Sequence, residues 1–311
     1  MADDLPYMDD NIIDLSLLLS SSPTVAAEEL NKLRNYLSSW GCFQLVNHGM
    51  SLEFLDEVRD ICKTFFRLPP EAKEHCAKTP DNSQGYGTDY MPDNGNPSSY
   101  RLLLTIYPED QRHPDRWPNT PNFRDLMWEY TLKAKTVHDQ VVQAMARSLN
   151  LEENSFLDGY GENYQIAARI NYYPPFPFAE LIRQVSKHAD ISATTLLLVD
   201  KEVEALELEK DGDWFKVPII PEAIMIIVGD QLEIMSNGIF KSAEHRQNPS
   251  PVKDRMSWAM FFSPDLEKEI APFKELVTED RPAMYKPITR YIDLFEKYYP
   301  KGIRPITAVK L

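Results

Sequence analysis

The second half of the chain alternates between short apolar stretches and turn-forming residues, and this pattern constrains the fold most strongly. Turn signals stand at Asp211-Gly212, Gly229-Asp230 and Asn237-Gly238, and the stretches between them have the length and composition of strands. Eight strands are predicted, over residues 165–173, 194–199, 204–208, 215–217, 223–228, 231–235, 240–244 and 255–262. Because no long helical pattern separates them, they predict a double-sheet jelly roll rather than a parallel sheet.

The first half of the chain has a helical pattern. Apolar residues recur at helical spacing over residues 26–40, 51–66 and 122–149, and Ser51 is placed to cap the second of these helices. An irregular loop is predicted over 79–100 and a further helix over 288–298. The predicted fold class is therefore α+β. It has a helical N-terminal lobe with short strands over 1–160, a jelly-roll catalytic core over 161–270 and a C-terminal helical segment packing on that core over 271–311.

Charge and cysteine content narrow the classes of partner. The net charge is -15, from 48 acidic and 33 basic residues, and such a surface repels phosphate backbones and anionic lipids. The chain has 3 cysteines, an odd number with no C-x-x-C pair, which favours a reducing compartment. No secretory signal pattern precedes the first helix. We expect a cytoplasmic protein without nucleic acid or membrane partners.

A histidine and a carboxylate stand two residues apart at His188-Ala189-Asp190, and His245 follows later in the chain. In a strand, alternate side chains share a face, so this spacing directs His188 and Asp190 to one point. Two imidazoles and one carboxylate would leave three coordination positions of an iron ion open. Since the same donors also suit zinc, spacing alone leaves a hydrolytic zinc site open as an alternative.

Arg255-Met256-Ser257 decides between these two sites. In a strand, Arg255 and Ser257 face the same way, and a guanidinium inside a barrel needs an anion because an unpaired buried charge is costly. A guanidinium binds a carboxylate through two parallel hydrogen bonds, which a lysine cannot do. With no acid between them, a dicarboxylate co-substrate is the expected partner.

The remaining histidines are predicted to lie outside the site. His48, in a turn-like Asn-His-Gly, is expected to make structural hydrogen bonds. His75, His113 and His138 fall in polar segments and are predicted to lie on the surface. Asp230 is expected to fix a turn rather than to bind a metal.

A series of short motifs runs along nearly the whole chain. The chain contains Trp40-Gly41-Cys42-Phe43, Val46-Asn47-His48-Gly49, Gly85-Tyr86-Gly87, Asn171-Tyr172-Tyr173-Pro174-Pro175, His188-x-Asp190, Gly229-Asp230-Gln231-Leu232, Ser236-Asn237-Gly238, Lys241-Ser242, His245-Arg246, Arg255-x-Ser257 and Arg281-Pro282-Ala283. In these it resembles the plant 2-oxoglutarate/iron(II)-dependent dioxygenase family, nearest to its specialised-metabolism branch. The resemblance spans nearly the whole chain. It implies a distorted double-stranded β-helix, or jelly roll, under a helical N-terminal lobe.

The resemblance also implies roles for individual residues. The implied iron ligands, which are also the implied catalytic residues, are His188, Asp190 and His245. The implied 2-oxoglutarate-binding residues are Arg255 and Ser257 at the distal carboxylate, Tyr173 through its hydroxyl, and Asn171 in support of the same pocket. Phe261 is at a position that often packs against substrate in the family.

Four further positions are candidates for shaping the substrate pocket. Phe176 stands where the family commonly has a cysteine after two prolines. Arg101 and Leu103 stand in a region where many members carry an acidic-aromatic pair. If either side chain points into the pocket, substrate preference should differ from that of the flavonoid enzymes with aromatics there. Tyr86, between two glycines, is expected either to anchor its loop or to line the pocket.

The implied activity is the oxidation of a small plant specialised metabolite by 2-oxoglutarate and O2 through an iron(IV)-oxo species. The outcome would be hydroxylation, dealkylation, desaturation or ring closure. Ascorbate is a further candidate cofactor, as a reductant, and a monomer is expected. Two alternatives remain open: an iron/ascorbate oxidase of the ethylene-forming type, and a catalytically silent metabolite-binding relative. Succinate release would distinguish a 2-oxoglutarate-dependent enzyme from the first alternative. Iron-dependent O2 uptake would distinguish an enzyme from the second.

Overall fold

The protein, seen here in a computed structural model that describes residues 5–88, 99–175, 187–248 and 250–311, is built on two sheets. Its large sheet consists of β1 (Ile12–Asp14), β2 (Cys42–Val46), β9 (Ile224–Val228), β6 (Thr194–Val199), β11 (Arg255–Ser263), β5 (Gln165–Tyr173), β4 (Tyr100–Tyr107) and β3 (Gly85–Gly87), in that spatial order. The small sheet consists of β10 (His245–Gln247), β7 (Leu206–Lys210) and β8 (Asp213–Lys216). Apart from β1 with β2, these neighbours pair antiparallel, as a jelly roll requires.

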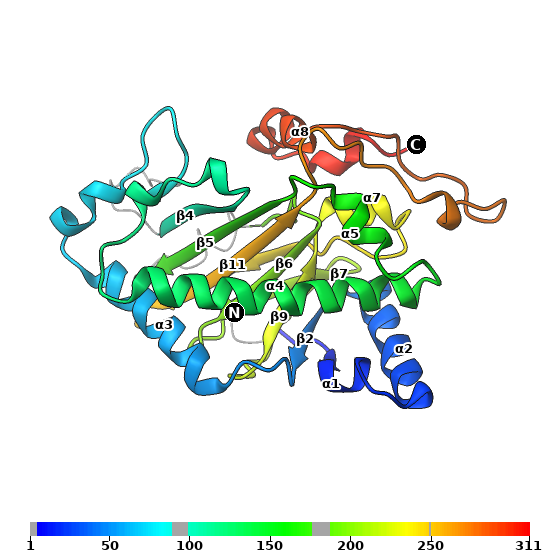
Figure 1. Ribbon diagram of the computed structural model, residues 1–311, viewed down its shortest axis with the longest axis horizontal. Coiled ribbons are helices and arrows are strands. Elements are labelled where there is room, and N and C mark those ends of the chain that lie inside the picture. The colour runs from blue at the N-terminus through cyan, green and yellow to red at the C-terminus, as the bar shows by residue number, and fades with distance from the viewer. Residues whose placement is uncertain (1–4, 89–98, 176–186, 249) are drawn as a thin grey trace.

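The helix α4 (Phe123–Ser148) runs across one face of the large sheet (Figure 1). The other helices are α1 (Leu15–Leu18), α2 (Pro23–Ser39), α3 (Leu52–Arg67), α5 (Ser155–Tyr160), α7 (Asp230–Met235) and α8 (Tyr291–Tyr298). The predicted cap of α3 is confirmed, since Ser51 Oγ accepts a hydrogen bond from the Phe54 amide at 3.2 Å. In the described part of the chain, no helix combines the length and apolar character that crossing a bilayer needs.

The two faces of the large sheet bury different clusters. The outer face packs against α4, where the rings of Tyr130 and Trp258 lie 4.5 Å apart. The inner face packs against the small sheet, with Leu197 and Ala259 in one cluster with Leu208. The strands β2, β6, β9 and β11 therefore have apolar side chains on both faces. The space between the two sheets is where a jelly roll places its ligands.

Two predicted strands are wrong. Residues 231–235 form the helix α7, whose six residues are all buried. A fully buried segment shows no polar side, so its spacing does not distinguish helix from strand. Residues 240–244 form no regular strand, and β10 begins only at His245. The turn predicted at Asp211-Gly212 is confirmed: both residues have positive φ, 54° and 94°, in the two-residue link between β7 and β8.

Part of the predicted irregular loop, residues 79–100, is strand. It contains β3, and its last residue, Tyr100, is the first residue of β4. The strand β4 was not predicted, although it pairs with β5 along most of its length. Four strands from the first 107 residues thus complete the same sheet as the later strands.

Candidate active site

His188, Asp190 and His245 come together in the structure. One donor atom from each lies within 4.8 Å of the others. The Nε2 atoms of His188 and His245 lie 3.6 Å and 3.8 Å from Asp190 Oδ1. Asp190 and His245 are buried, whereas the His188 side chain is 33% exposed. Two imidazoles and one carboxylate at these separations can bind one metal ion and leave its remaining positions open.

The backbone brings His188 to His245 directly. The amide of each donates to the carbonyl oxygen of the other, at 3.0 Å and 2.8 Å, and the two form an isolated antiparallel bridge. The strand assumed for His188-Ala189-Asp190 is therefore reduced to one bridged residue. Convergence of the ligands depends on this bridge rather than on the alternation of a strand.

Further contacts orient two of the ligands. The Nδ1 atom of His245 lies 3.1 Å from the carbonyl oxygen of Ala243, which leaves Nε2 toward Asp190. The hydroxyl of Thr195 on β6 donates to Asp190 Oδ2 at 2.6 Å, while Oδ1 faces the two imidazoles. Such contacts fix ring and carboxylate orientation and affect metal affinity. Sequence reasoning did not identify Thr195, because no local pattern indicates which hydroxyl will reach a ligand.

Strand register places the predicted co-substrate residues on one face of the sheet. Arg255 is opposite Tyr173, and Ser257 is opposite Asn171, in the pairing of β11 with β5. Directly opposed residues project from the same face. That face also carries Thr195, because β6 places it opposite Phe261 of β11. The Arg-Ser pair therefore lies on the same inner face of the large sheet as Thr195, which contacts the metal ligand Asp190.

Arg255 is buried in the way that an anion-binding residue would be. It is 1% exposed, and its Nε and Nη1 atoms have no hydrogen-bond partner among the described residues. Burial lowers the pKa of Arg255, because a charge inside the protein is poorly solvated. The carboxylate of the neighbouring Asp200 already has other partners. Its Oδ2 lies 3.0 Å from Lys63 Nζ and accepts a hydrogen bond from the Met256 amide at 3.2 Å. A carboxylate ligand fits the unsatisfied guanidinium.

The other predicted pocket residues lie in different surroundings. Arg101 is opposite Asn171, on the face of Ser257, and its Nη1 donates to the Ser83 carbonyl oxygen at 2.9 Å. Leu103, two residues further along β4 and opposite Arg169, is half-buried. Phe261 is half-buried between the two sheets. The ring of Tyr86 packs on Phe65, Phe66 and Tyr100. Phe176 lies outside the described residues.

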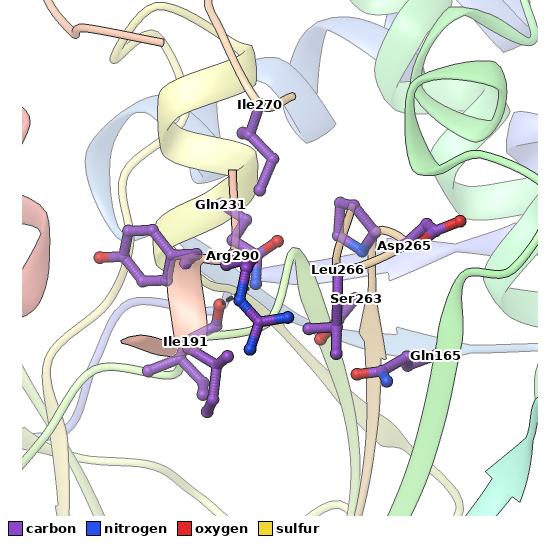
Figure 2. A pocket seen from close by; sticks show the side chains of 11 residues that line it. Gln165, Ile191, Gln231, Ser263, Asp265, Leu266, Ile270 and Arg290 are labelled. Atoms are coloured by element: carbon purple, nitrogen blue, oxygen red, sulfur yellow. Dashed lines mark hydrogen bonds between the residues drawn. The ribbon is translucent and has the colours of Figure 1, made fainter. Parts of the chain in front are cut away.

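A cavity of about 120 Å³ lies beside the metal-binding loop (Figure 2). Ile191, next to Asp190, lines it together with Gln165 and Ser263 at the ends of β5 and β11. Figure 2 shows the Arg290 guanidinium extending between these side chains. None of the three metal ligands is among its lining residues.

The surface location predicted for His138 is wrong. This residue of α4 is 1% exposed, its Nε2 lies 2.9 Å from Thr194 Oγ1, and its ring stacks on Phe262 at 3.7 Å. The structural role predicted for His48 is confirmed: Nδ1 accepts from the Met50 amide at 3.2 Å, so Nε2 donates to a carbonyl oxygen at 2.7 Å.

Fold and site together define a class of protein. A jelly roll holding two histidines and one aspartate, with a buried guanidinium that keeps two nitrogen atoms unpaired in the described structure, is a non-haem iron(II) oxygenase. Two family models match the chain: the 2OG-Fe(II) oxygenase superfamily over residues 165–264, and the non-haem dioxygenase in morphine synthesis N-terminal family over residues 11–122. The chain belongs to the 2-oxoglutarate/iron(II) oxygenase family, and Fe(II) and 2-oxoglutarate are its cofactor and co-substrate.

Relatives of known activity agree with this assignment. The chain is 36% identical over 289 residues to codeine O-demethylase of Papaver somniferum, covering 92% of this chain and 80% of the relative. It is 40% identical over 254 residues to a flavonol synthase/flavanone 3-hydroxylase of Eustoma exaltatum subsp. russellianum, covering 79% and 75%. These are alignments of most of each chain, so the likeness is not confined to the metal motif.

Solved structures give the same picture of the fold. A crystal structure of JOX2 in complex with 2OG, Fe and JA superposes with a TM-score of 0.84 at 31% identity, covering 99% of this chain and 90% of that one. A rice dioxygenase for auxin oxidation superposes with a TM-score of 0.82 at 23% identity, covering 97% and 100%. The predicted jelly-roll fold is confirmed.

Proposed function

We propose that this oxygenase oxidises a small plant specialised metabolite, with His188, Asp190 and His245 holding iron and with Arg255 and Ser257 holding the distal carboxylate of 2-oxoglutarate. The pair of buried, unsatisfied nitrogen atoms of Arg255 carries the proposal. Burying a charged guanidinium without hydrogen-bond partners costs free energy unless an anion binds to it. The Ser257 hydroxyl, on the same face two residues further along β11, is placed to add a hydrogen bond.

Tyr173 and Asn171 complete the proposed co-substrate pocket. The Arg255 guanidinium carbon lies 5.2 Å from the centre of the Tyr173 ring, so that ring limits where the guanidinium can point. The Asn171 side-chain oxygen accepts from Arg169 Nε at 2.8 Å. Asn171 would thus act by fixing its neighbour on the inner face. Its amide nitrogen is the group left for a direct contact with ligand.

The protein's part in the reaction is placement and the exclusion of water. Bound iron, with 2-oxoglutarate and O2, supplies the oxidising chemistry. Asp190 is held by Thr195, and His245 by the Ala243 carbonyl oxygen, so the ligands need little rearrangement when metal binds. Apolar residues between the sheets, among them Leu197, keep water from the reacting centre.

The substrate class follows from the relatives. Codeine O-demethylase and flavonol synthase are named for reactions on small plant metabolites. We propose a substrate of comparable size, with Tyr86, Arg101, Leu103, Phe176 and Phe261 as candidate lining residues. Hydroxylation, dealkylation, desaturation and ring closure all fit the class of chemistry.

The test is an assay of substrate-dependent succinate release. The protein is supplied with Fe(II), 2-oxoglutarate, ascorbate and O2, and a panel of alkaloids, flavonoids and plant carboxylic acids is screened. Succinate and an oxidised product should appear in equal amounts with at least one compound. Substrate oxidation with O2 uptake but no succinate would instead assign an iron/ascorbate oxidase. A protein that binds metabolites without any O2 uptake would contradict the proposal.

We further propose that the protein acts as a cytoplasmic monomer without nucleic acid or membrane partners. The net charge of -15 supports the absence of nucleic acid and membrane partners, because it opposes binding to phosphate-rich surfaces. As functional units we propose the N-terminal lobe 1–160, the catalytic core 161–270 and the C-terminal segment 271–311. Light scattering and subcellular fractionation test the first proposal, and activity after limited proteolysis tests the second.

A further inference from the structure

The turn that begins α7 holds the loop that carries Asp190. The amide of Gly229 donates to the Ala193 carbonyl oxygen at 2.9 Å, and the amide of Asp230 donates to the Asp190 carbonyl oxygen at 2.8 Å. A Cβ atom at Gly229 would overlap the carbonyl oxygen of Ser192. Only glycine allows this close approach. The position of Asp190 is therefore coupled to the position of α7.

The same helix also holds the segment that leads to His245. Ser242, three residues before this ligand, donates from Oγ to Asp230 Oδ1 at 2.7 Å and from its amide to Glu233 Oε2 at 2.6 Å. Its carbonyl oxygen accepts from Arg304 Nη2 at 2.9 Å. Side chain, amide and carbonyl of one residue are thus all engaged, which fixes the chain just before His245.

The C-terminal segment supplies the ion-pair and hydrogen-bond partners of the two buried acids of α7. Asp230 and Glu233 are 0% and 5% exposed. Arg304 Nη2 lies 3.0 Å from Asp230 Oδ1 and 3.8 Å from Glu233 Oε2. The hydroxyl of Tyr291 donates to Asp230 Oδ2 at 2.7 Å, and that of Tyr285 to Glu233 Oε1 at 2.6 Å. Buried carboxylates are stable only with such partners.

We propose that Asp230, Glu233, Ser242 and Arg304, here called the anchor cluster, position His245 relative to Asp190 and so set the metal affinity of the site. The C-terminal segment, which Figure 1 shows at the same end of the molecule as α7, thereby acts on the metal centre without contacting the metal. The proposal rests on the metal site of the proposed function. Arg304 is a positioning residue in this scheme, since it acts only through Ser242, Asp230 and Glu233.

The test measures Mn(II) binding to the metal-free protein by calorimetry, without 2-oxoglutarate, and measures thermal unfolding of the same metal-free samples. Arg304→Met removes the cation of the cluster, and Ser242→Ala removes only the hydroxyl link to Asp230. Each should raise the Mn(II) dissociation constant about tenfold, in the range seen when contacts that orient metal ligands are removed. Arg304→Lys, which keeps the charge, should recover most of the affinity.

Arg147→Met is the matched control. Its guanidinium is ion-paired with Glu153 at 2.7 Å, and its side chain is 33% exposed, against 25% for Arg304. Within the described structure, it forms no hydrogen bond or ion pair with α7 or with the segments that carry the metal ligands. Its dissociation constant should stay within about twofold of the unmutated value. If Arg304→Met and Ser242→Ala lower the unfolding temperature yet bind Mn(II) like the unmutated protein, the cluster is only structural and the proposal is overturned. If the unmutated protein binds no Mn(II), the metal assignment itself fails.

Discussion

Replacing Arg255 with methionine separates an anion-binding arginine from a structural one. Two of its nitrogen atoms, Nε and Nη1, are buried without a partner in the described structure. A hydrogen bond to a charged group contributes roughly 1.5–3 kcal/mol, so losing two should cost 2-oxoglutarate binding about 3–6 kcal/mol. At about 1.4 kcal/mol per factor of ten, the dissociation constant should rise by roughly 10²–10⁴.

The same substitution should leave the ligand-free protein as stable as before. Methionine removes a buried charge that lacks an anion, and this change is neutral or stabilising. Arg59 is the contrasting case, because it is 2% exposed yet donates to the carbonyl oxygens of Val199 and Pro221 and to Asp56. Arg59→Met leaves two partly buried carbonyl oxygens without this donor, each at about 1–2 kcal/mol, so it should lower the free energy of unfolding by about 2–4 kcal/mol.

The assays are urea denaturation of the metal-free proteins and calorimetric titration of 2-oxoglutarate in the presence of Mn(II). Arg255→Met should change the free energy of unfolding by less than about 1 kcal/mol and weaken co-substrate binding. Arg59→Met should do the reverse. If Arg255→Met lost as much stability as Arg59→Met, or if it bound 2-oxoglutarate as the unmutated protein does, Arg255 would be a structural residue and the reasoning would be refuted.

Three further predictions concern the metal site and the buried histidines. His188→Ala should abolish metal-dependent turnover while far-ultraviolet circular dichroism stays unchanged, and full activity in this variant would refute the ligand assignment. Thr195→Val removes the hydrogen bond to Asp190 and should weaken Mn(II) binding about tenfold by calorimetry. Burial lowers the pKa of His48 and His138. The unfolded chain therefore takes up protons below about pH 6.5 that the native protein does not, and the free energy of unfolding of the metal-free protein should fall as pH falls from there. His138→Gln should flatten that dependence in urea titrations, and an unchanged dependence would contradict the role of this histidine.

The jelly-roll prediction succeeded where local sequence and final structure follow the same rule. Strands 165–173 and 194–199 were predicted with the bounds that they have, because Ile, Val, Thr and Tyr favour extended backbone and turn residues end each run. The prediction failed at α7, where every residue is buried, and at β4, which was not predicted as a strand. In both, the neighbours in space decide the conformation.

The sequence indicates the chemistry of the site but not its geometry. The donor types at His188, Asp190 and His245 and the guanidinium of Arg255 are properties of single residues, and they pointed to iron and a dicarboxylate. The bridge between His188 and His245 was not predictable, nor was the contact of Thr195 with Asp190. These depend on which strands become neighbours.

By itself, the sequence determined which donor atoms are available, where the chain turns, as at Asp211-Gly212, and which segments carry enough apolar side chains for a core. Those properties arise from side-chain chemistry and from backbone sterics over a few residues. The tertiary structure alone decided that His138 is buried, that Arg255 keeps two nitrogen atoms unsatisfied, and that Arg304 reaches Asp230, 74 positions away. Burial and long-range pairing depend on the packing of the whole chain, because the solvent or partner of each group is set by segments distant in sequence.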